Sequence, residues 1–132
     1  MVELAGRATD AGVRVLICDD APAMRSLLCV VIGLREGMSV IGEAADGDEA
    51  IVQAELLQPD VILLDLAMPR RTGLEALPEI NRVAPESKIV ILSGFAASII
   101  DDEVVAHEVA SYLQKGVEPD DILAAIEAAA AG

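Results

Sequence analysis

The sequence predicts an α/β protein with a doubly wound parallel sheet, and two observations carry that prediction. Short aliphatic runs bounded by turn residues alternate along the chain with stretches of helical apolar spacing. The runs are continuously apolar, as in Val61-Ile62-Leu63-Leu64, rather than alternating with polar residues. Continuous apolar runs are typical of strands buried on both faces, and parallel sheets bury their strands in this way.

We expect strands at residues 13–18, 39–44, 61–64, 88–92 and 110–113. Helices are expected at residues 22–35, 47–57, 73–83, 96–108 and 120–131. Because crossovers between parallel strands are right-handed, this (βα)5 order predicts a flavodoxin-like arrangement of layers around a five-stranded parallel sheet.

Several prolines lie at or near the ends of the expected helices, and one lies within a helix. Pro22 stands at a first-turn position, where proline is tolerated, and Pro59 follows the end of the second helix. Pro78 falls within the third helix, and we expect it to distort an early turn. Glu118-Pro119-Asp120 is a start signal for the last helix.

Length and composition limit the function classes. The 132 residues suggest one domain at 13–132, preceded by a flexible leader at 1–12. No apolar run approaches the ~18 residues of a membrane span, and no signal peptide is visible. The net charge of −14, from 9 basic and 23 acidic residues, argues against direct nucleic-acid binding. Cys18 and Cys29 lie in apolar patterns and are interpreted as buried reduced thiols of a cytoplasmic protein.

Chemically useful side chains fall at the ends of four expected strands. Asp19-Asp20 follows the first strand, Asp65 the third, Ser93 the fourth and Lys115 the last. The carboxyl ends of the strands are where sites form in open α/β sheets, so we expect these groups to converge. A carboxylate cluster of this kind suits Mg²⁺ or Mn²⁺ rather than zinc. Taken alone, Asp19-Asp20 could instead cap the helix that begins near Pro22, a position for which Asp20 is suited.

The chain resembles the receiver (CheY-like) domain of two-component response regulators over about residues 13–131. The resemblance rests on Ile17-Cys18-Asp19-Asp20, Leu63 to Pro69, Thr72-Gly73-Leu74-Glu75, Leu92-Ser93-Gly94 and Tyr112 to Gly116, in order and at family spacing.

The resemblance implies a role for each matching residue. Asp65 would accept a phosphoryl group from the phosphohistidine of a sensor kinase, which makes it a signalling phosphoacceptor rather than the nucleophile of a conventional enzyme. Asp20, Asp65 and the backbone carbonyl of Ala67 would bind Mg²⁺ directly, and Asp19 would act through water. Lys115 and Ser93 would hold phosphoryl oxygens, and Tyr112 would turn inward as Ser93 moves. Phosphoryl transfer needs such an in-line nucleophile, a metal and cationic stabilisation.

The resemblance leaves several features open. Gly116 follows Lys115 where many receivers have proline and a cis bond, so the isomer of this bond is undecided. Arg70-Arg71 are interpreted as solvated loop charges rather than phosphate ligands. Ala67 and Phe95 should flank the approach of water to the phosphoryl group without orienting it, which predicts a long-lived phosphorylated state.

Two other functions share part of this pattern. A phosphatase of the haloacid-dehalogenase type also uses a strand-end aspartate as its nucleophile. That chemistry requires a second acid two residues later as general acid and base, and this chain has Ala67 there. A flavin-binding flavodoxin-like module would need a phosphate-cradling loop after the first strand, where Asp19-Asp20 would repel the flavin phosphate. The expected partners are a sensor histidine kinase or phosphotransfer protein and an output domain or protein target, with a phosphorylation-dependent homodimer left open and no membrane partner.

Overall fold

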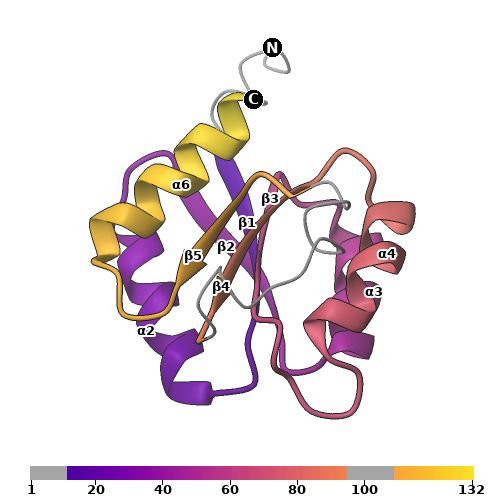
Figure 1. Ribbon diagram of the computed structural model, residues 1–132. Coiled ribbons are helices and arrows are strands. Elements are labelled where there is room, and N and C mark those ends of the chain that lie inside the picture. Colours follow the sequence, from indigo (N-terminus) through magenta and orange to yellow (C-terminus); the bar gives the residue numbers. More distant parts are fainter. Residues whose placement is uncertain (1–11, 95–108) are drawn as a thin grey trace.

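The computed structural model describes residues 12–94 and 109–132. Five strands and four helices lie within those ranges (Figure 1). The strands are β1 (Val13–Cys18), β2 (Met38–Ala44), β3 (Val61–Leu64), β4 (Lys88–Ser93) and β5 (Ser111–Gln114). The helices are α2 (Pro22–Gly33), α3 (Gly47–Leu57), α4 (Gly73–Val83) and α6 (Pro119–Ala131).

The five strands form one parallel sheet in the order β2-β1-β3-β4-β5. Helices α2 and α6 cover one face of this sheet, and α3 and α4 cover the other (Figure 1). The predicted flavodoxin-like, doubly wound arrangement is therefore confirmed.

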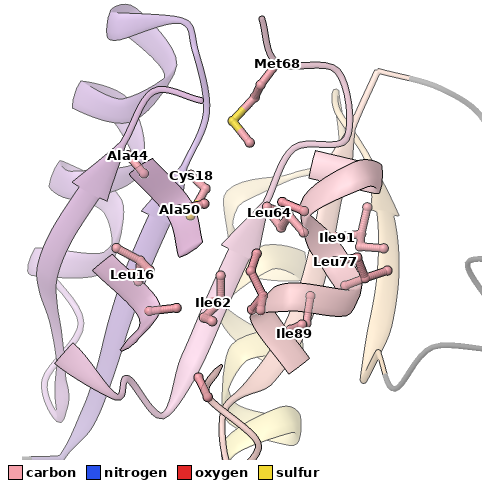
Figure 2. Packing of buried hydrophobic residues seen from close by; sticks show 14 of the residues in the cluster. Leu16, Cys18, Ala44, Ala50, Ile62, Leu64, Met68, Leu77, Ile89 and Ile91 are labelled. Carbon is pink, nitrogen blue, oxygen red and sulfur yellow. The ribbon is translucent and has the colours of Figure 1, made fainter. Parts of the chain in front are cut away.

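Alternate residues of each central strand enter opposite cores. Ile62 and Leu64 of β3 pack with α3 and α4, whereas Val61 and Leu63 pack with α2 and α6. All four are at most 1% exposed, which explains why this strand reads as a continuous apolar run. Figure 2 shows the first of these cores, in which Met68 from the loop after β3 joins Leu64 and Leu77.

The strand register brings the carboxyl ends of the central strands together. Cys18 of β1 pairs with Leu64 of β3, and Leu64 pairs in turn with Ile91 of β4. The residues that follow β1 and β3 therefore emerge side by side at one edge of the sheet, here called the carboxyl edge. The opposite edge is called the amino edge.

The observed bounds differ from the expected ones by at most two residues, with the largest difference at the end of α2. Helix α4 continues through Pro78, so the expected distortion does not interrupt it. The expected helix at 96–108 and the expected leader, apart from Gly12, lie outside the described residues. Within the described ranges, no helix is both long enough and apolar enough to cross a membrane.

Both cysteines are free thiols, as expected. Cys18 is buried in the core, and burial raises the pKa of its thiol, so it stays protonated. Cys29 is only half-buried, because its sulfur lies at the surface of α2 beside Glu43. The interpretation as a buried thiol is therefore right for Cys18 and too strong for Cys29.

Candidate functional site

Asp65 is a buried carboxylate held at the end of β3. Its backbone N–H donates to the carbonyl of Cys18 at 2.9 Å, which continues the β1–β3 ladder by one residue. Its Oδ1 accepts a hydrogen bond from the backbone N–H of Ala67 at 3.0 Å. The side chain is 4% exposed, so its charge is largely removed from water.

Asp19 and Asp20 lie beside it but differ in exposure. Asp19 is buried, and its Oδ1 accepts from the backbone N–H of Ala21 at 2.8 Å. Asp20 is exposed. The N-cap of α2 is Ala21, without a capping side-chain hydrogen bond. The alternative that Asp20 caps this helix is therefore wrong, because the chain makes one more residue of turn before the helix begins.

Lys115, which follows β5, reaches across to both buried acids. Its Nζ lies 2.7 Å from Asp19 Oδ2 and 3.0 Å from Asp65 Oδ2. Burial acts to lower the pKa of this ammonium, but hydrogen bonds and charges from Asp19 and Asp65 outweigh it and raise the pKa overall. Lys115 is consequently held in its charged form between the two carboxylates.

The acid cluster fits a hard divalent cation. One carboxylate oxygen from each of Asp19, Asp20 and Asp65 lies within 4.8 Å of the others. Three carboxylates face one ammonium, which leaves an excess of negative charge at a largely buried site. Oxygen donors in this number and charge are what Mg²⁺ or Mn²⁺ would use.

Ser93 and Tyr112 stand next to this cluster on β4 and β5. The Ser93 hydroxyl is completely buried and has no well-formed hydrogen-bond partner among the described residues. The pKa of the Tyr112 phenol is raised, mainly by burial. The neighbouring Ser93 hydroxyl lowers this pKa, and the charge of Asp65 raises it further. The phenol therefore lies close to Ser93 and within the electrostatic reach of Asp65.

The loop between β3 and α4, residues 66–72, is tightly placed. Leu66 and Met68 are buried, whereas Ala67 between them is exposed. Gly73 donates its N–H to the Leu66 carbonyl at 3.1 Å, and a Cβ at Gly73 would stand 2.0 Å from the Asp65 carbonyl oxygen. Only glycine permits this approach of α4 to the end of β3.

The structure bears on three features that the sequence leaves open. The described residues contain no cis peptide bond, so Lys115–Gly116 is trans, and Gly116 has a φ of +108°. Arg70 and Arg71 are loop charges as expected, but they form ion pairs with Asp46 and Asp48 rather than being simply solvated. Phe95 lies outside the described residues.

Sequence reasoning missed Asp46, a buried acid in the loop between β2 and α3. Its side chain accepts from the Glu49 N–H at 2.9 Å and so caps α3. That hydrogen bond, followed by the contact with Arg70, lowers the pKa of Asp46. The Asp46-Gly47 start of the helix was the available signal for the cap, but the pairing with Arg70 had none in the sequence.

Comparison with known proteins identifies the family. The response regulator receiver domain profile matches residues 15–127. The chain is 40% identical over 120 residues to the uncharacterized transcriptional regulatory protein YxjL of Bacillus subtilis, covering 91% of this chain and 55% of YxjL. It is 33% identical to the chemotaxis protein CheY of Thermotoga maritima, covering 87% of this chain and 95% of CheY.

The fold comparison agrees. The crystal structure of the response regulator domain of Thermotoga maritima CheB superposes with a TM-score of 0.84 at 30% identity, covering 92% of this chain and 98% of that domain. None of these relatives favours a haloacid-dehalogenase phosphatase or a flavin-binding module. The chain therefore belongs to the response regulator receiver domain family, and the match over residues 15–127 includes the acid cluster.

Proposed function

We propose that this domain is a phosphorylation switch in which Asp65 accepts a phosphoryl group in a Mg²⁺-dependent reaction. The observation that carries the proposal is that Asp19, Asp20 and Asp65 converge at the carboxyl edge, where Lys115 supplies one positive charge against three negative ones. A site with this charge excess is completed by a divalent cation, which would offset the repulsion between the acids and an incoming phosphoryl group.

Asp65 is the candidate nucleophile because its carboxylate is fixed. The Ala67 N–H holds Oδ1, which leaves Oδ2, the oxygen facing Lys115, oriented for attack. The donor would be the phosphohistidine of a sensor kinase or phosphotransfer protein. Asp20, Asp65 and the Ala67 carbonyl would hold the metal directly, and Asp19 would hold it through water.

Lys115 and Ser93 would stabilise the transferred group. The Lys115 ammonium already contacts the Asp65 carboxylate, so it can pair with a phosphoryl oxygen after transfer. The Ser93 hydroxyl is buried without a well-formed partner among the described residues, so a hydrogen bond to the phosphoryl group would satisfy it. Movement of Ser93 would alter its contact with Tyr112 and carry the change toward the surface of β5.

Incubation with acetyl phosphate and Mg²⁺, followed by intact mass measurement and a hydroxylamine-lability assay, tests this proposal. We expect the wild type to gain one phosphoryl group and Asp65→Asn to gain none, with EDTA abolishing the reaction. Asp60→Asn, at the opposite end of β3, is the matched control and should be labelled normally. Labelling of Asp65→Asn, or labelling that EDTA leaves unchanged, would contradict the proposal.

The phosphorylated state should be long-lived. Ala67 is exposed beside Asp65 and has no group that could orient an attacking water. Ala67→Asn should therefore shorten the phosphate half-life, measured by loss of the phosphorylated mass after the donor is removed. An unchanged half-life would show that residue 67 does not control the approach of water.

The chain spans about half the length of YxjL, a transcriptional regulatory protein, and nearly all of CheY. We propose that this domain passes its state either to an output domain or to a separate protein target, and that a homodimer formed on phosphorylation is one route. The net charge of −14 argues against direct DNA binding by these 132 residues. Salt-sensitive DNA binding by the purified chain would overturn that last point.

A further inference from the structure

Two arginines close to Asp65 in the chain, Arg70 and Arg71, are engaged with the start of α3. Arg70 Nε donates to Asp46 Oδ2 at 3.0 Å, and its Nη2 contacts the same oxygen. The carbonyl oxygen of Arg71 accepts a hydrogen bond from the Gly47 N–H at 2.7 Å. The Nε of the Arg71 side chain pairs with Asp48 Oδ1 at 2.9 Å. The β3–α4 loop is thereby attached to the N-terminus of α3.

The two ion pairs differ in burial. The difference lies in the acids, since Asp46 is 4% exposed and Asp48 is 63% exposed, whereas the side chains of Arg70 and Arg71 are 66% and 42% exposed. An ion pair between exposed side chains contributes little to stability, so the Arg71–Asp48 pair should matter little. A buried carboxylate that loses its cation keeps its desolvation cost, so of the two ion pairs the Arg70–Asp46 pair should contribute more to holding the loop.

The backbone of Arg70 points to the same conclusion. The φ of Arg70 is +61°, in the left-handed region that residues other than glycine rarely adopt. This conformation is unfavourable for a residue with a Cβ atom, so other interactions must offset its cost. The contacts of the guanidinium with Asp46 are the interactions that this residue gains there.

The attachment lies close in the chain to the groups that would hold the metal. Arg70 is three residues from Ala67, whose N–H orients the Asp65 carboxylate and whose carbonyl is the candidate metal ligand. Gly73 fixes the far end of the loop against the Asp65 and Leu66 carbonyls. Between these two points, the Arg70–Asp46 pair ties the loop to a buried side chain of another element.

We propose that Arg70 is a positioning residue for the metal site: its ion pair with Asp46 fixes the β3–α4 loop so that the Ala67 backbone and the Asp65 carboxylate are set for Mg²⁺. This inference deepens the proposed function and rests on it. Arg70 touches none of the acids of the cluster in the described contacts, so its effect would pass through the loop backbone.

The test is Mg²⁺ titration of the folded 132-residue chain by calorimetry, in wild type and four variants. Arg70→Gly is the informative substitution, because glycine accepts the positive φ while losing the ion pair. We expect it to weaken Mg²⁺ binding by no more than roughly 10-fold, the low end of the loss for a group bonded directly to a metal ligand, but by clearly more than the control variant does. Arg71→Ala is the matched control and should bind Mg²⁺ within about twofold of wild type.

The remaining variants connect the effect to Asp46. Asp46→Asn keeps an oxygen to cap α3 but loses the charge that Arg70 binds. The Asp46→Asn/Arg70→Gly double variant should bind Mg²⁺ no more weakly than the weaker single variant, because both changes remove one interaction. If the losses of Mg²⁺ affinity in the two single variants were additive in the double variant, Arg70 and Asp46 would not act through one shared ion pair.

A second readout does not need the metal. In metal-free protein, the Ala67 amide should exchange its hydrogen faster in Arg70→Gly than in wild type, while the amides of β3 should not change. Equal Mg²⁺ affinity in Arg70→Gly and wild type overturns the inference. A wild type that binds no Mg²⁺ overturns the proposed function instead. The hydrogen exchange rate of the Ala67 amide then decides alone whether the Arg70–Asp46 ion pair fixes the loop.

Discussion

The two edges of the sheet are completed in different ways. At the amino edge, Arg14 donates through Nη1 to the Gln58 carbonyl at 2.8 Å and through Nη2 to the Leu57 carbonyl at 2.6 Å. Gln58, in a left-handed conformation at the end of α3, donates in turn to the Val83 carbonyl at the end of α4. Asp60 accepts from the Arg14 N–H, so the ends of two helices and two strands are joined.

At the carboxyl edge, the chain leaves its polar groups incompletely matched. Two buried carboxylates, Asp19 and Asp65, share the ammonium of Lys115, and the Ser93 hydroxyl has no well-formed partner within the described ranges. At the amino edge, Arg14, Gln58 and Asp60 satisfy the ends of their elements, although the Ser111 hydroxyl at the start of β5 is also buried without a partner within the described ranges. What distinguishes the carboxyl edge is its charge, because Asp19, Asp20 and Asp65 gather there around one ammonium, an excess that a cation would offset under the proposed function.

The largest expected effect comes from disturbing the backbone at the carboxyl edge. Gly73→Ala places a Cβ 2.0 Å from the Asp65 carbonyl oxygen, so β3 and α4 must separate. We expect a loss of about 2–4 kcal/mol in the free energy of unfolding, measured by urea denaturation. Gly33→Ala is the control, because a Cβ there meets nothing within 4 Å, and its stability should not fall. Equal stability of the two variants would show that the loop can absorb the change.

Removing a partner at the amino edge should cost less. Arg14→Ala takes the donors from the Leu57 and Gln58 carbonyls, and we expect a loss of about 1–2 kcal/mol in the free energy of unfolding, with Mg²⁺ binding unchanged. Arg82→Ala, which removes an exposed pair with Glu79, should change stability by less than about 0.5 kcal/mol. If Arg14→Ala altered Mg²⁺ affinity, the two edges would not be independent.

Removing a charge at the carboxyl edge should have the opposite sign. In metal-free protein, Asp65→Asn relieves the repulsion with Asp19 while keeping an oxygen for the Ala67 N–H. We expect the free energy of unfolding to rise by about 1 kcal/mol, measured by urea denaturation in EDTA. A destabilised Asp65→Asn would mean that the ion pair with Lys115 outweighs the repulsion.

The smallest effect concerns pH. The capping hydrogen bond from Glu49 and the contact with Arg70 lower the pKa of Asp46 below its ordinary value of 3.8. Stability from a lowered carboxyl pKa is present above the unfolded pKa and is lost as the pH falls through the folded pKa. The stability difference between wild type and Asp46→Asn should therefore shrink between neutral pH and about pH 3. A difference that does not change with pH would assign the effect of the substitution to packing alone.

Much of this architecture follows from local sequence signals. Apolar runs predicted the strands, Pro59 marked the end of α3, and the strand-end positions of Asp19, Asp65, Ser93 and Lys115 predicted their convergence. These features depend on residues that are neighbours in the chain or on the general rule that parallel strands share their carboxyl edge.

The features that escaped prediction join distant loops. Asp46 and Arg70 are separated by 24 residues, and Arg14 is 44 residues from Gln58. Whether such pairs meet depends on strand register and on single backbone conformations, such as the positive φ of Arg70 and Gln58. The alternative in which Asp20 caps α2 failed for a similar reason, because one extra residue of turn separates β1 from α2.

The central claim, that the carboxyl edge is completed by a cation, is tested most directly by unfolding the wild type and Asp65→Asn in urea with and without Mg²⁺. Mg²⁺ at about 100 times its Kd should raise the free energy of unfolding of the wild type by about 2.7 kcal/mol and that of Asp65→Asn by much less. The order of stability of the two proteins should then reverse when Mg²⁺ is added. A wild type whose unfolding is unaffected by Mg²⁺ would contradict the account.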